Sequence, residues 1–457
     1  MGGAGPLDYV RGMLLLLSLL ACSEPLESLS CEAALSPTMT LLPQVRLSFA
    51  EPVQSWVEYA VPELPDERTD TIEGASVTHS LRGAYAQVEV EWTAWADDGR
   101  GPSAVCEGSI ETGSLPMGLA DLTVEVEAAS DLEGPELMVA SMGGGPFVAI
   151  FDRQGRIRWF VESDAGTLPI DVQLGQDGDR VRFNSFDPRF EEDIGLVRSV
   201  DLDGEVIEDV QTSLAHHVFA QHPDGTLAWL ALDIREFTDP DSGETDEVVG
   251  DAIVERAPQG DELRIGTVWD WPDFEPDLDE PTLGLYPGMV DWTHGNALKR
   301  VDEGDSYLLS MANVDLVTRV DRATGQPIEH YGSRGFQVEE GSRALNHQHD
   351  PSLLEGDRLL VFNSVMDPAG SGASEYEIDR EAGVLREVWS YGFGPDTFNP
   401  VLGQAIDLGE GRRIVNFGFL GSMHLVEADG TPSWVVQGPP GHAFRQMQPF
   451  PGFWPGR

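Results

Sequence analysis

The chain has 457 residues and a formal net charge of -51, which comes from 79 acidic and 28 basic residues. Lys299 is its only lysine. Proteins bind nucleic acids and anionic lipid surfaces through basic residues on their surface. The excess of acidic residues therefore argues against both kinds of partner. The same excess of acid favours solubility.

The first residues have the pattern of an export signal. Arg11 precedes the apolar run 13–20, which is too short to span a bilayer and typical of a signal peptide. The run Leu-Leu-Ala-Cys that ends at Cys22 looks like a bacterial lipobox. We therefore expect residues 1–22 to direct export, with Cys22 lipidated and the protein anchored to the outer membrane, in the periplasm or at the cell surface. An ordinary signal peptide with a chance cysteine is the alternative.

Two further cysteines, Cys31 and Cys106, are left if Cys22 carries a lipid. An oxidising compartment favours a disulfide between them. The alternative is two unrelated small core residues. The spacing of the cysteines does not predict a zinc site, because there is no Cys-x-x-Cys pair.

Residues 32–127 predict a small β-sandwich of immunoglobulin or fibronectin type III kind. Apolar and polar residues alternate along three stretches, and clusters of Pro, Gly and Asp separate them. The stretches are residues 44–49, 55–61 and 84–95. Residues 114–118 have the composition of a linker.

The rest of the chain repeats a β-hairpin pattern. Each copy has an apolar alternation, a polar residue, a turn glycine and a second apolar run that often ends in Trp. The copies lie at residues 150–159, 200–207, 253–269, 320–325, 378–389 and 426–434. Their turn glycines are about 47 to 65 residues apart, a period typical of propeller blades with loop insertions.

A second hairpin alternates with the first. Its copies lie at residues 172–183, 217–229, 294–309, 349–362 and 404–415. Two hairpins make a four-stranded blade, and six blades close into a ring that leaves no long exposed sheet edge. We therefore predict an all-β protein in which a six-bladed β-propeller occupies residues 135–457. A pair of β-sandwiches is the alternative, but the regular repetition argues against it.

Two motifs lie at the start of the second hairpin. They are Asp-Trp-Thr-His-Gly-Asn at 291–296 and Gln-His-Asp at 348–350, and His217 has the equivalent place in an earlier repeat. Equivalent places in a closed ring face one central axis, so these imidazoles are predicted to form a site. A single His beside a strand is more often structural, and only the repetition favours a functional role here.

Other histidines are given structural roles. Since alternate strand residues point to opposite faces, His216 and His347 are expected to point away from the site. The alternative for the first pair is a register shifted by one residue, which would exchange His216 and His217. His222 lies in a predicted turn, where we expect it to be solvated.

With these motifs the chain resembles the bacterial arylsulfotransferases, from about Pro135 to its end. The resemblance implies an N-terminal β-sandwich and a six-bladed propeller. It implies an enzyme that moves a sulfuryl group from an aryl sulfate ester to a phenol, with no nucleotide sulfate donor and no cofactor. It also implies that His349 is the covalent nucleophile, that His294 and Asn296 bind the sulfuryl oxygens, and that His217 completes the ring of imidazoles.

The residue types suit this chemistry. Sulfuryl transfer is an in-line displacement, so positioning and charge neutralisation carry most of the catalysis. A nitrogen nucleophile divides the transfer into two steps and predicts ping-pong kinetics. A second His can protonate the leaving phenolate or deprotonate the acceptor phenol. Histidine clusters also bind metals, but no carboxylate or Cys is obviously grouped with these.

One departure from the family concerns an arginine that clamps the sulfate. The matching residue of this chain is Ala312, so the bidentate anion ligand that the family has at this position is missing. Arg319, Arg334 or Arg343 could replace it. The departure leaves a second function open, a non-catalytic cell-surface propeller that binds a ligand and whose active site has decayed.

Overall fold

The computed structural model describes residues 29–129, 132–175, 177–187, 194–240, 242–277, 286, 288–365, 370–439 and 442–454. Cys22 and the expected signal peptide lie outside these ranges. Within them the regular structure is β-strand, apart from four short 3-10 turns: η1 (Val268–Asp270), η2 (Asp302–Gly304), η3 (Ala312–Val314) and η4 (Pro395–Thr397). The described residues contain no helix long and apolar enough to cross a membrane.

The N-terminal strands form one six-stranded sheet in the order β1-β2-β5-β6, with β3 and β4 also paired to β2. Buried and exposed residues alternate along β2 and β5, so one face of the sheet covers an apolar core. The strands are β1 (Ser30–Leu35), β2 (Pro43–Ala60), β3 (Glu67–Arg68), β4 (Ile72–Ser80), β5 (Glu89–Asp97) and β6 (Ser103–Glu111).

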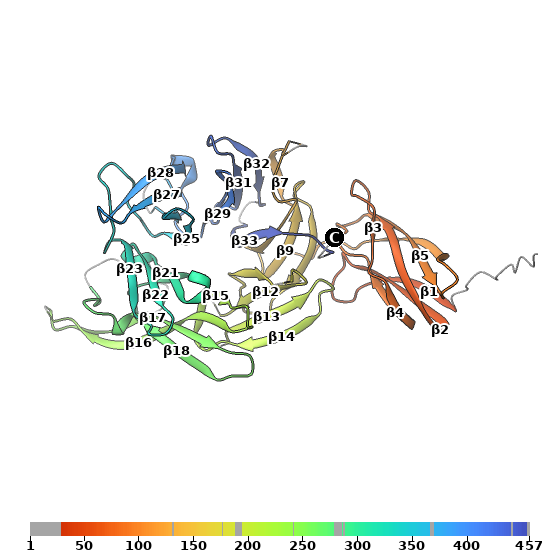
Figure 1. The fold of residues 1–457 in the computed structure, drawn as a ribbon, viewed down its shortest axis with the longest axis horizontal. Helices are drawn as coiled ribbons and strands as arrows, with labels where there is room; N and C mark the ends of the chain where they lie inside the picture. Colours follow the sequence, from red (N-terminus) through yellow and green to blue (C-terminus); the bar gives the residue numbers. More distant parts are fainter. Residues whose placement is uncertain are drawn as a thin grey trace, which may run out of the picture.

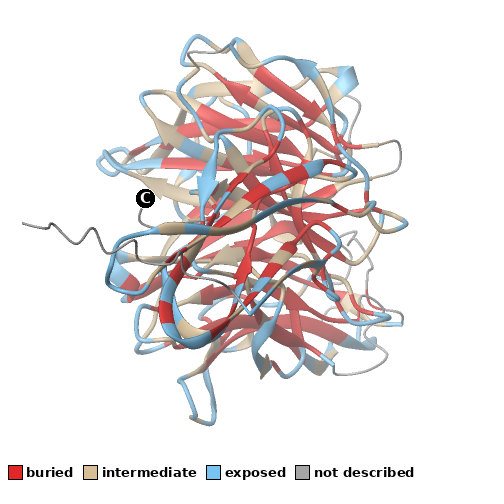
Figure 2. Cartoon of the chain, turned by 90° about the vertical axis from the view of Figure 1, so that its right-hand side faces the viewer, coloured by how far each residue is buried: buried red, intermediate tan, exposed pale blue. Residues whose placement is uncertain are grey.

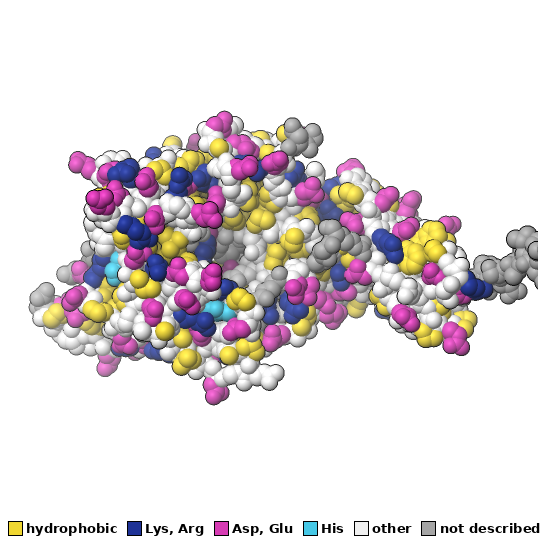
Figure 3. Space-filling view, in the orientation of Figure 1, with side chains coloured by type: hydrophobic (Ala, Val, Ile, Leu, Met, Phe, Trp, Pro, Cys, Tyr) yellow, Lys and Arg dark blue, Asp and Glu magenta, His cyan; other side chains and the backbone are white. Residues whose placement is uncertain are grey.

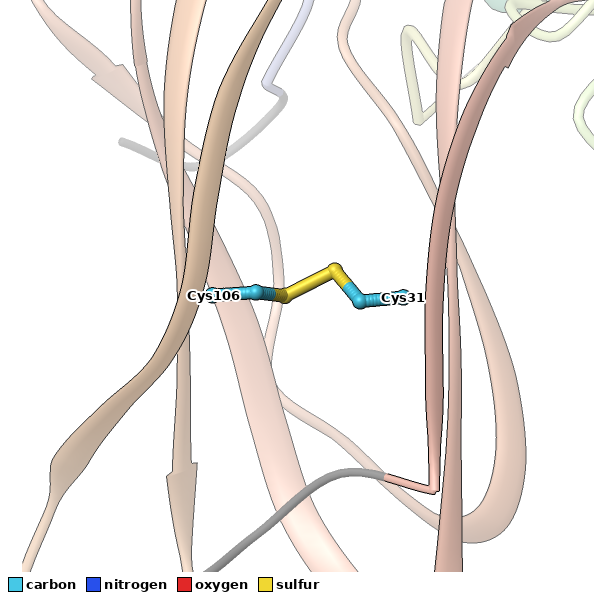
Figure 4. Close-up of a disulfide and its surroundings, with 2 residues drawn as sticks. All are labelled: Cys31 and Cys106. Carbon is cyan, nitrogen blue, oxygen red and sulfur yellow. A yellow bond between two sulfur atoms is a disulfide. The ribbon is translucent and has the colours of Figure 1, made fainter.

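The predicted disulfide between Cys31 and Cys106 is present (Figure 4). It joins β1 to β6, the two ends of the strand order, across a Cα–Cα distance of 6.7 Å. The sheet therefore folds back on itself around its core. The closer assignment to an immunoglobulin or fibronectin type III sandwich stays a prediction.

The remaining strands form six sheets arranged in a ring, which confirms the predicted six-bladed propeller (Figure 1). The first two blades contain β8 (Leu137–Met142), β9 (Phe147–Asp152), β10 (Ile157–Glu162) and β33 (Phe444–Phe450), then β11 (Val172–Leu174), β12 (Arg180–Ser185), β13 (Leu196–Asp201) and β14 (Val206–Gln211). The third contains β15 (Ala215–Gln221), β16 (Leu227–Thr238), β17 (Thr245–Arg256), β18 (Glu262–Thr267) and β19 (Val290–Asp291).

The other three blades follow in chain order. The fourth contains β20 (Gly295–Val301), β21 (Ser306–Met311), β22 (Leu316–Asp321) and β23 (Pro327–Gly332). The fifth contains β24 (Gln337–Val338), β25 (His349–Leu354), β26 (Arg358–Asn363), β27 (Gly372–Asp379) and β28 (Val384–Gly392). The sixth contains β29 (Gln404–Gly409), β30 (Arg412–Phe417), β31 (Ser422–Val426), β32 (Pro432–Gln437) and β7 (Thr123–Val126).

Pairing between distant parts of the chain closes the ring. The last strand, β33, pairs with β8, so the first blade takes strands from both ends of the propeller. Strand β7 pairs with β32 and extends the sixth blade, although residues 123–126 fall within the range expected for the N-terminal domain. Strands from the two ends of the propeller sequence therefore complete its first and sixth blades.

The hairpin turns explain why the repeat was visible in the sequence. Gly155 joins β9 to β10 with a φ of 79°, a backbone conformation that residues with a Cβ rarely adopt. The strands on either side are largely buried, and burial in the ring is concentrated in the strands rather than the loops (Figure 2). Turn chemistry and apolar alternation therefore agree with the fold.

The innermost strands of all six blades line a central cavity of about 510 Å³. Its wall is polar and includes Gln173, Lys299, Asp350, Gln404 and Gln446. The outer surface carries many acidic side chains, as one face of the molecule shows (Figure 3). The single lysine of the chain thus lies inside the ring.

The N-terminal sheet contacts the propeller through a few polar pairs. Arg82 Nε lies 2.7 Å from the Asp203 carboxylate in the second blade. Trp454, which follows the last strand, donates from Nε1 to the Tyr59 hydroxyl at 3.0 Å. Arg158 also donates to the carbonyl of Gly83. The C-terminal segment therefore packs between the two parts of the protein.

Candidate active site

The three predicted imidazoles come from three neighbouring blades. His217 is in β15, His294 immediately precedes β20, and His349 begins β25. The rings of His217 and His294 meet edge to face, with centroids 4.8 Å apart. His349 lies near enough to His294 for the charge of one imidazole to lower the pKa of the other. The sequence placed these side chains together correctly.

Irregularities at the starts of the inner strands direct these side chains. The pairing of β15 with β16 shifts register between His216 and Phe219, and that of β25 with β26 shifts between His349 and Ser352. His217 and His294 have φ values of 52° and 50°, in the left-handed region that residues with a Cβ rarely adopt. Bulges and left-handed residues re-aim side chains, and both are common beside active sites.

The expectation that His216 would point away from His217 was wrong. Their Nδ1 atoms are 2.9 Å apart, and the rings are perpendicular. The bulge and the left-handed His217 interrupt the alternation on which the expectation depended. His216 is fully buried, and its Nε2 lies 3.0 Å from Asp251 Oδ1. His216 therefore connects His217 to a buried carboxylate.

Asp251, in β17, accepts several hydrogen bonds. Gly295 N donates to its Oδ2 at 2.7 Å, and Thr293 Oγ1 donates to the same oxygen. Burial alone would raise the pKa of this carboxyl, but the contacts with His216, Thr293 and Gly295 together lower it below its ordinary value. An ionised carboxylate thus joins the third blade to the fourth.

His294 has its own carboxylate partner. Asp291 Oδ2 lies 2.6 Å from His294 Nδ1, and both side chains are buried. A carboxylate at this nitrogen keeps the proton on Nδ1 and stabilises the doubly protonated ring. It also leaves Nε2 facing the other imidazoles. Among the described residues no hydrogen-bond partner of His294 Nε2 is found.

His349 is held through a backbone carbonyl. Its Nδ1 donates to the carbonyl oxygen of His347 at 2.9 Å, and Ser364 Oγ is 3.2 Å from the same nitrogen. Burial, with a smaller effect from His294, lowers the pKa of His349 to about 3. The ring is therefore neutral at neutral pH, with its lone pair on Nε2. A neutral imidazole with a free nitrogen is the nucleophilic form.

The three rings share one arrangement. Each uses Nδ1 for a protein contact, to His216, Asp291 or the His347 carbonyl, so each has Nε2 left for a ligand. Burial, with smaller effects from the other histidines, also lowers the pKa of His217 well below its ordinary value. The site thus combines the neutral imidazoles of His217 and His349 with His294, and it is backed by Asp251 and Asp291, two carboxylates that the sequence analysis did not single out. The place of Asp291 three residues before His294 in one motif was the available signal.

Asn296 uses one of its two amide N–H groups to join two blades of the propeller. Its Nδ2 donates to the Gln348 carbonyl at 2.9 Å, which joins the fourth blade to the fifth. The Gln348 side chain in turn donates to Ser310 Oγ and to the Met311 and Leu316 carbonyls. Gln348 therefore positions His349. One N–H of Asn296 remains for a ligand, and its predicted role in binding sulfuryl oxygens stays a prediction.

Position 312, where the family has an arginine, is fully buried. Ala312 has no exposed surface, and its backbone N donates to the His294 carbonyl at 3.1 Å. The three arginines named as replacements lie elsewhere: Arg319 pairs with Asp302, Arg334 lies over the Phe274 ring and Arg343 pairs with Glu387. The expectation that one of them compensates is wrong, because each has a partner away from the imidazoles.

His222 is also not solvated as expected. It is buried, and its Nε2 is 2.5 Å from the Tyr307 hydroxyl. Tyr307 donates to Glu255, which also binds Arg322. This network lies between the third and fourth blades and has a structural role. His347 lies at the rim, with Nδ1 3.8 Å from Asp315 Oδ1.

The described residues contain no group of three or more His, Cys, Asp or Glu side chains arranged to hold a metal ion. The site offers the neutral nucleophile His349, two further imidazoles in His217 and His294, and the carboxylates of Asp251 and Asp291.

Comparison with known families gives one match. The family described as arylsulfotransferase (ASST) matches residues 123–335. The resemblance to the arylsulfotransferases is confirmed over this range. It contains His217, His294 and Asn296, whereas His349 lies beyond it. Among curated proteins there is no match to the chain.

Solved structures similar to the chain are distant from it. A protein of unknown function from Bacteroides caccae is 12% identical, with 70% of this chain and 100% of that chain covered and a TM-score of 0.43. The periplasmic gluconolactonase of Pseudomonas aeruginosa is 13% identical, with 87% and 98% covered and a TM-score of 0.39. A β-propeller domain from Myceliophteria thermophila is 13% identical, with 60% and 89% covered and a TM-score of 0.35.

Proposed function

We propose that this protein is an arylsulfotransferase that moves a sulfuryl group from an aryl sulfate ester to a phenol through a His349-bound intermediate. The observation that carries the proposal is the neutral His349, whose Nδ1 is bonded to a carbonyl and whose Nε2 has no hydrogen-bond partner among the described residues. The family match over residues 123–335 supports the reaction class.

The first step forms a bond between His349 Nε2 and sulfur as the bond from sulfur to the aryl oxygen breaks. The bonding electrons go to the departing phenolate, which takes a proton from a protonated His294. Asp291, 2.6 Å from His294 Nδ1, stabilises the charged ring before the transfer. The second step is the reverse with the acceptor: His294 removes the phenol proton, the phenolate attacks sulfur and the nitrogen–sulfur bond breaks.

His217 is suited to orienting the sulfuryl oxygens. Its Nδ1 contacts His216, which is backed by Asp251, and its ring meets that of His294 edge to face. If the Nδ1–H of His216 donates to Nδ1 of His217, the neutral His217 carries its proton on Nε2 and can donate it to a sulfuryl oxygen. The remaining N–H of Asn296 is the second candidate ligand. Donors that are fixed before the reaction stabilise charge as it shifts onto the oxygens.

The decisive experiment is rapid mixing of the protein with 4-nitrophenyl sulfate, followed by mass spectrometry of the quenched protein. A sulfuryl adduct on His349, a burst of nitrophenol and transfer of label to added phenol are the expected results. His349→Ala should show none of the three. Wild-type protein that releases no nitrophenol above His349→Ala, with several acceptors tried, would instead favour a non-catalytic binding propeller, as the alanine at position 312 already does.

A further inference from the structure

Arg445, in the last strand, is a buried cation that has no acidic partner among the described residues. Its exposed fraction is 9%. Nη1 donates to the carbonyl oxygens of Met142 at 2.8 Å and Pro169 at 3.0 Å. Neither Nε nor Nη2 has a hydrogen-bond partner in the described part of the chain. In a protein with 79 acidic residues, a buried guanidinium without a carboxylate is unexpected, because buried charges are normally paired.

The pairing of β33 places Arg445 at the same level of the ring as the imidazoles. The register of β33 with β8 shifts between Phe444 and Met447, as that of β15 with β16 shifts between His216 and Phe219. Arg445 directly follows Phe444, where the shift of β33 begins, and His217 directly follows His216, where the shift of β15 begins. Since both are innermost strands, and the inner strands of a propeller run in one direction, the two residues lie at the same end of the channel.

A short series of contacts connects the two positions. Pro169 O accepts from Arg445, and the next residue, Ile170, donates from its backbone N to Asn184 Oδ1 at 3.2 Å. Asn184 Nδ2 then donates to the carbonyl of His217 at 2.9 Å. Arg445 is therefore joined to the imidazole site through the loop that opens the second blade.

Two of the three imidazoles, those of His217 and His349, add no positive charge to the site, so a fixed cation beyond His294 would strengthen the binding of an anion. Burial keeps the imidazoles of His217 and His349 neutral, and the nearby Asp251 is ionised. A sulfate ester carries a negative charge, which this surrounding would repel. Burial lowers the pKa of Arg445 only to about 10, so its guanidinium stays charged at neutral pH.

We propose that Arg445 binds the sulfuryl oxygens of the donor and replaces the arginine that is absent at Ala312. The inference rests on the proposed sulfuryl transfer and adds an anion-binding residue from a different blade. Arg445 lies outside residues 123–335, the range over which the arylsulfotransferase family matches the chain. The planar fork of an arginine offers Nε and Nη2 as parallel donors to two oxygens of one anion.

A purely structural role is the competing explanation. The bonds from Nη1 to Met142 and Pro169 join the first blade to the second, and losing them would loosen the ring. Such loosening would weaken all ligands alike. Loss of an anion site instead lowers the affinity for a charged aromatic ligand and leaves the affinity for an uncharged one unchanged, and this difference decides between the two roles.

The test compares benzenesulfonate, an anion that cannot be transferred, with uncharged phenol, by calorimetric titration of the full protein. Arg445→Gln should weaken benzenesulfonate binding roughly 10- to 100-fold, the usual loss for a charge-assisted hydrogen bond, and leave phenol binding unchanged. Arg445→Lys keeps the charge without the fork and should lose less. Arg386→Gln, which removes an arginine that is 40% exposed and paired with Glu339, should match the wild type.

The outcomes separate this inference from the proposed function. Folded Arg445→Gln that binds benzenesulfonate as tightly as the wild type would overturn the role of Arg445, even if His349 is sulfurylated. If Arg445→Gln does not fold, an equal loss of affinity for benzenesulfonate and for phenol in Arg445→Lys would overturn it. Arginine-dependent binding of the anion without any adduct on His349 would support the site and contradict the transfer reaction.

Discussion

A Cβ at Gly295 would lie 2.6 Å from the carboxyl carbon of Asp251. Glycine at this position lets Asp251 accept the Gly295 N–H and approach Thr293 and His216 at the same time. The glycine of the His-Gly-Asn motif is therefore required by close packing between two blades, and a side chain there would displace the carboxylate that backs the imidazoles.

Gly295→Ala should lower the free energy of unfolding by about 1 to 3 kcal/mol, the usual cost of overpacking, and should reduce sulfuryl transfer more than stability alone explains. Urea unfolding and 4-nitrophenyl sulfate turnover measure the two effects. The control is Gly394→Ala, where an added Cβ has no atom within 4 Å. Equal effects of the two variants would contradict the account of Gly295.

Asp291→Asn should slow transfer from a donor with a poor leaving group more than transfer from a donor with a good one. The variant keeps a hydrogen-bonding side chain beside His294 but loses the charge that stabilises its protonated ring. We expect roughly a 10²- to 10⁴-fold loss of turnover with phenyl sulfate, whose leaving group needs a proton, and a much smaller loss with 4-nitrophenyl sulfate. Equal losses with the two donors would show that His294 is not the acid.

Acid should destabilise the protein through His349. Burial lowers its pKa from 6.5 to about 3, so between these values the unfolded chain binds a proton that the folded protein does not. The stabilising contribution is complete above the unfolded pKa and is lost as the pH falls towards the folded one.

Urea midpoints measured at about pH 7 and about pH 5 should therefore differ less for His349→Gln than for the wild type. Because the pKa of His217 is lowered in the same direction, the slope is reduced and not abolished. An unchanged slope in His349→Gln would argue that this ring is already protonated when folded.

Ala312→Arg should not restore a family-like anion clamp. The alanine side chain is fully buried beside the backbone of His294, so an arginine there has no room and its charge has no partner. We expect loss of folded protein, seen by circular dichroism and calorimetry. Glu340→Arg, at an exposed position, should unfold like the wild type; a stable and more active Ala312→Arg would refute this view of the site.

The disulfide should stabilise the N-terminal sheet and leave the active site unchanged. Cys31 and Cys106 are separated by 75 residues, and closing a loop of that length stabilises the folded state by about 4 kcal/mol in the chain-entropy estimate. The double variant to serine should melt at a lower temperature while kcat for sulfuryl transfer stays the same. A fall in kcat would mean that the sheet supports the site directly.

Much of the fold was predictable because its determinants are local. Apolar alternation at period two and turn glycines such as Gly155 are properties of neighbouring residues, so hairpins and their number could be counted. The ring closure was not predictable in this way. The pairing of β33 with β8 joins residues some 300 positions apart, such as Phe444 and Met142, and no local pattern marks it.

The active site was likewise predictable from the sequence only where local patterns determine it. Sequence repetition by itself placed His217, His294 and His349 around one axis, because equivalent positions in a closed repeat are equivalent in space. The pairing of Cys31 with Cys106 was predicted separately, from the number of cysteines and the expected oxidising compartment. Only the tertiary structure decided that His216 turns towards His217 and that the guanidinium of Arg445 has no carboxylate partner among the described residues. These depend on bulges and on contacts between blades, where the physical cause lies in residues far apart in the chain.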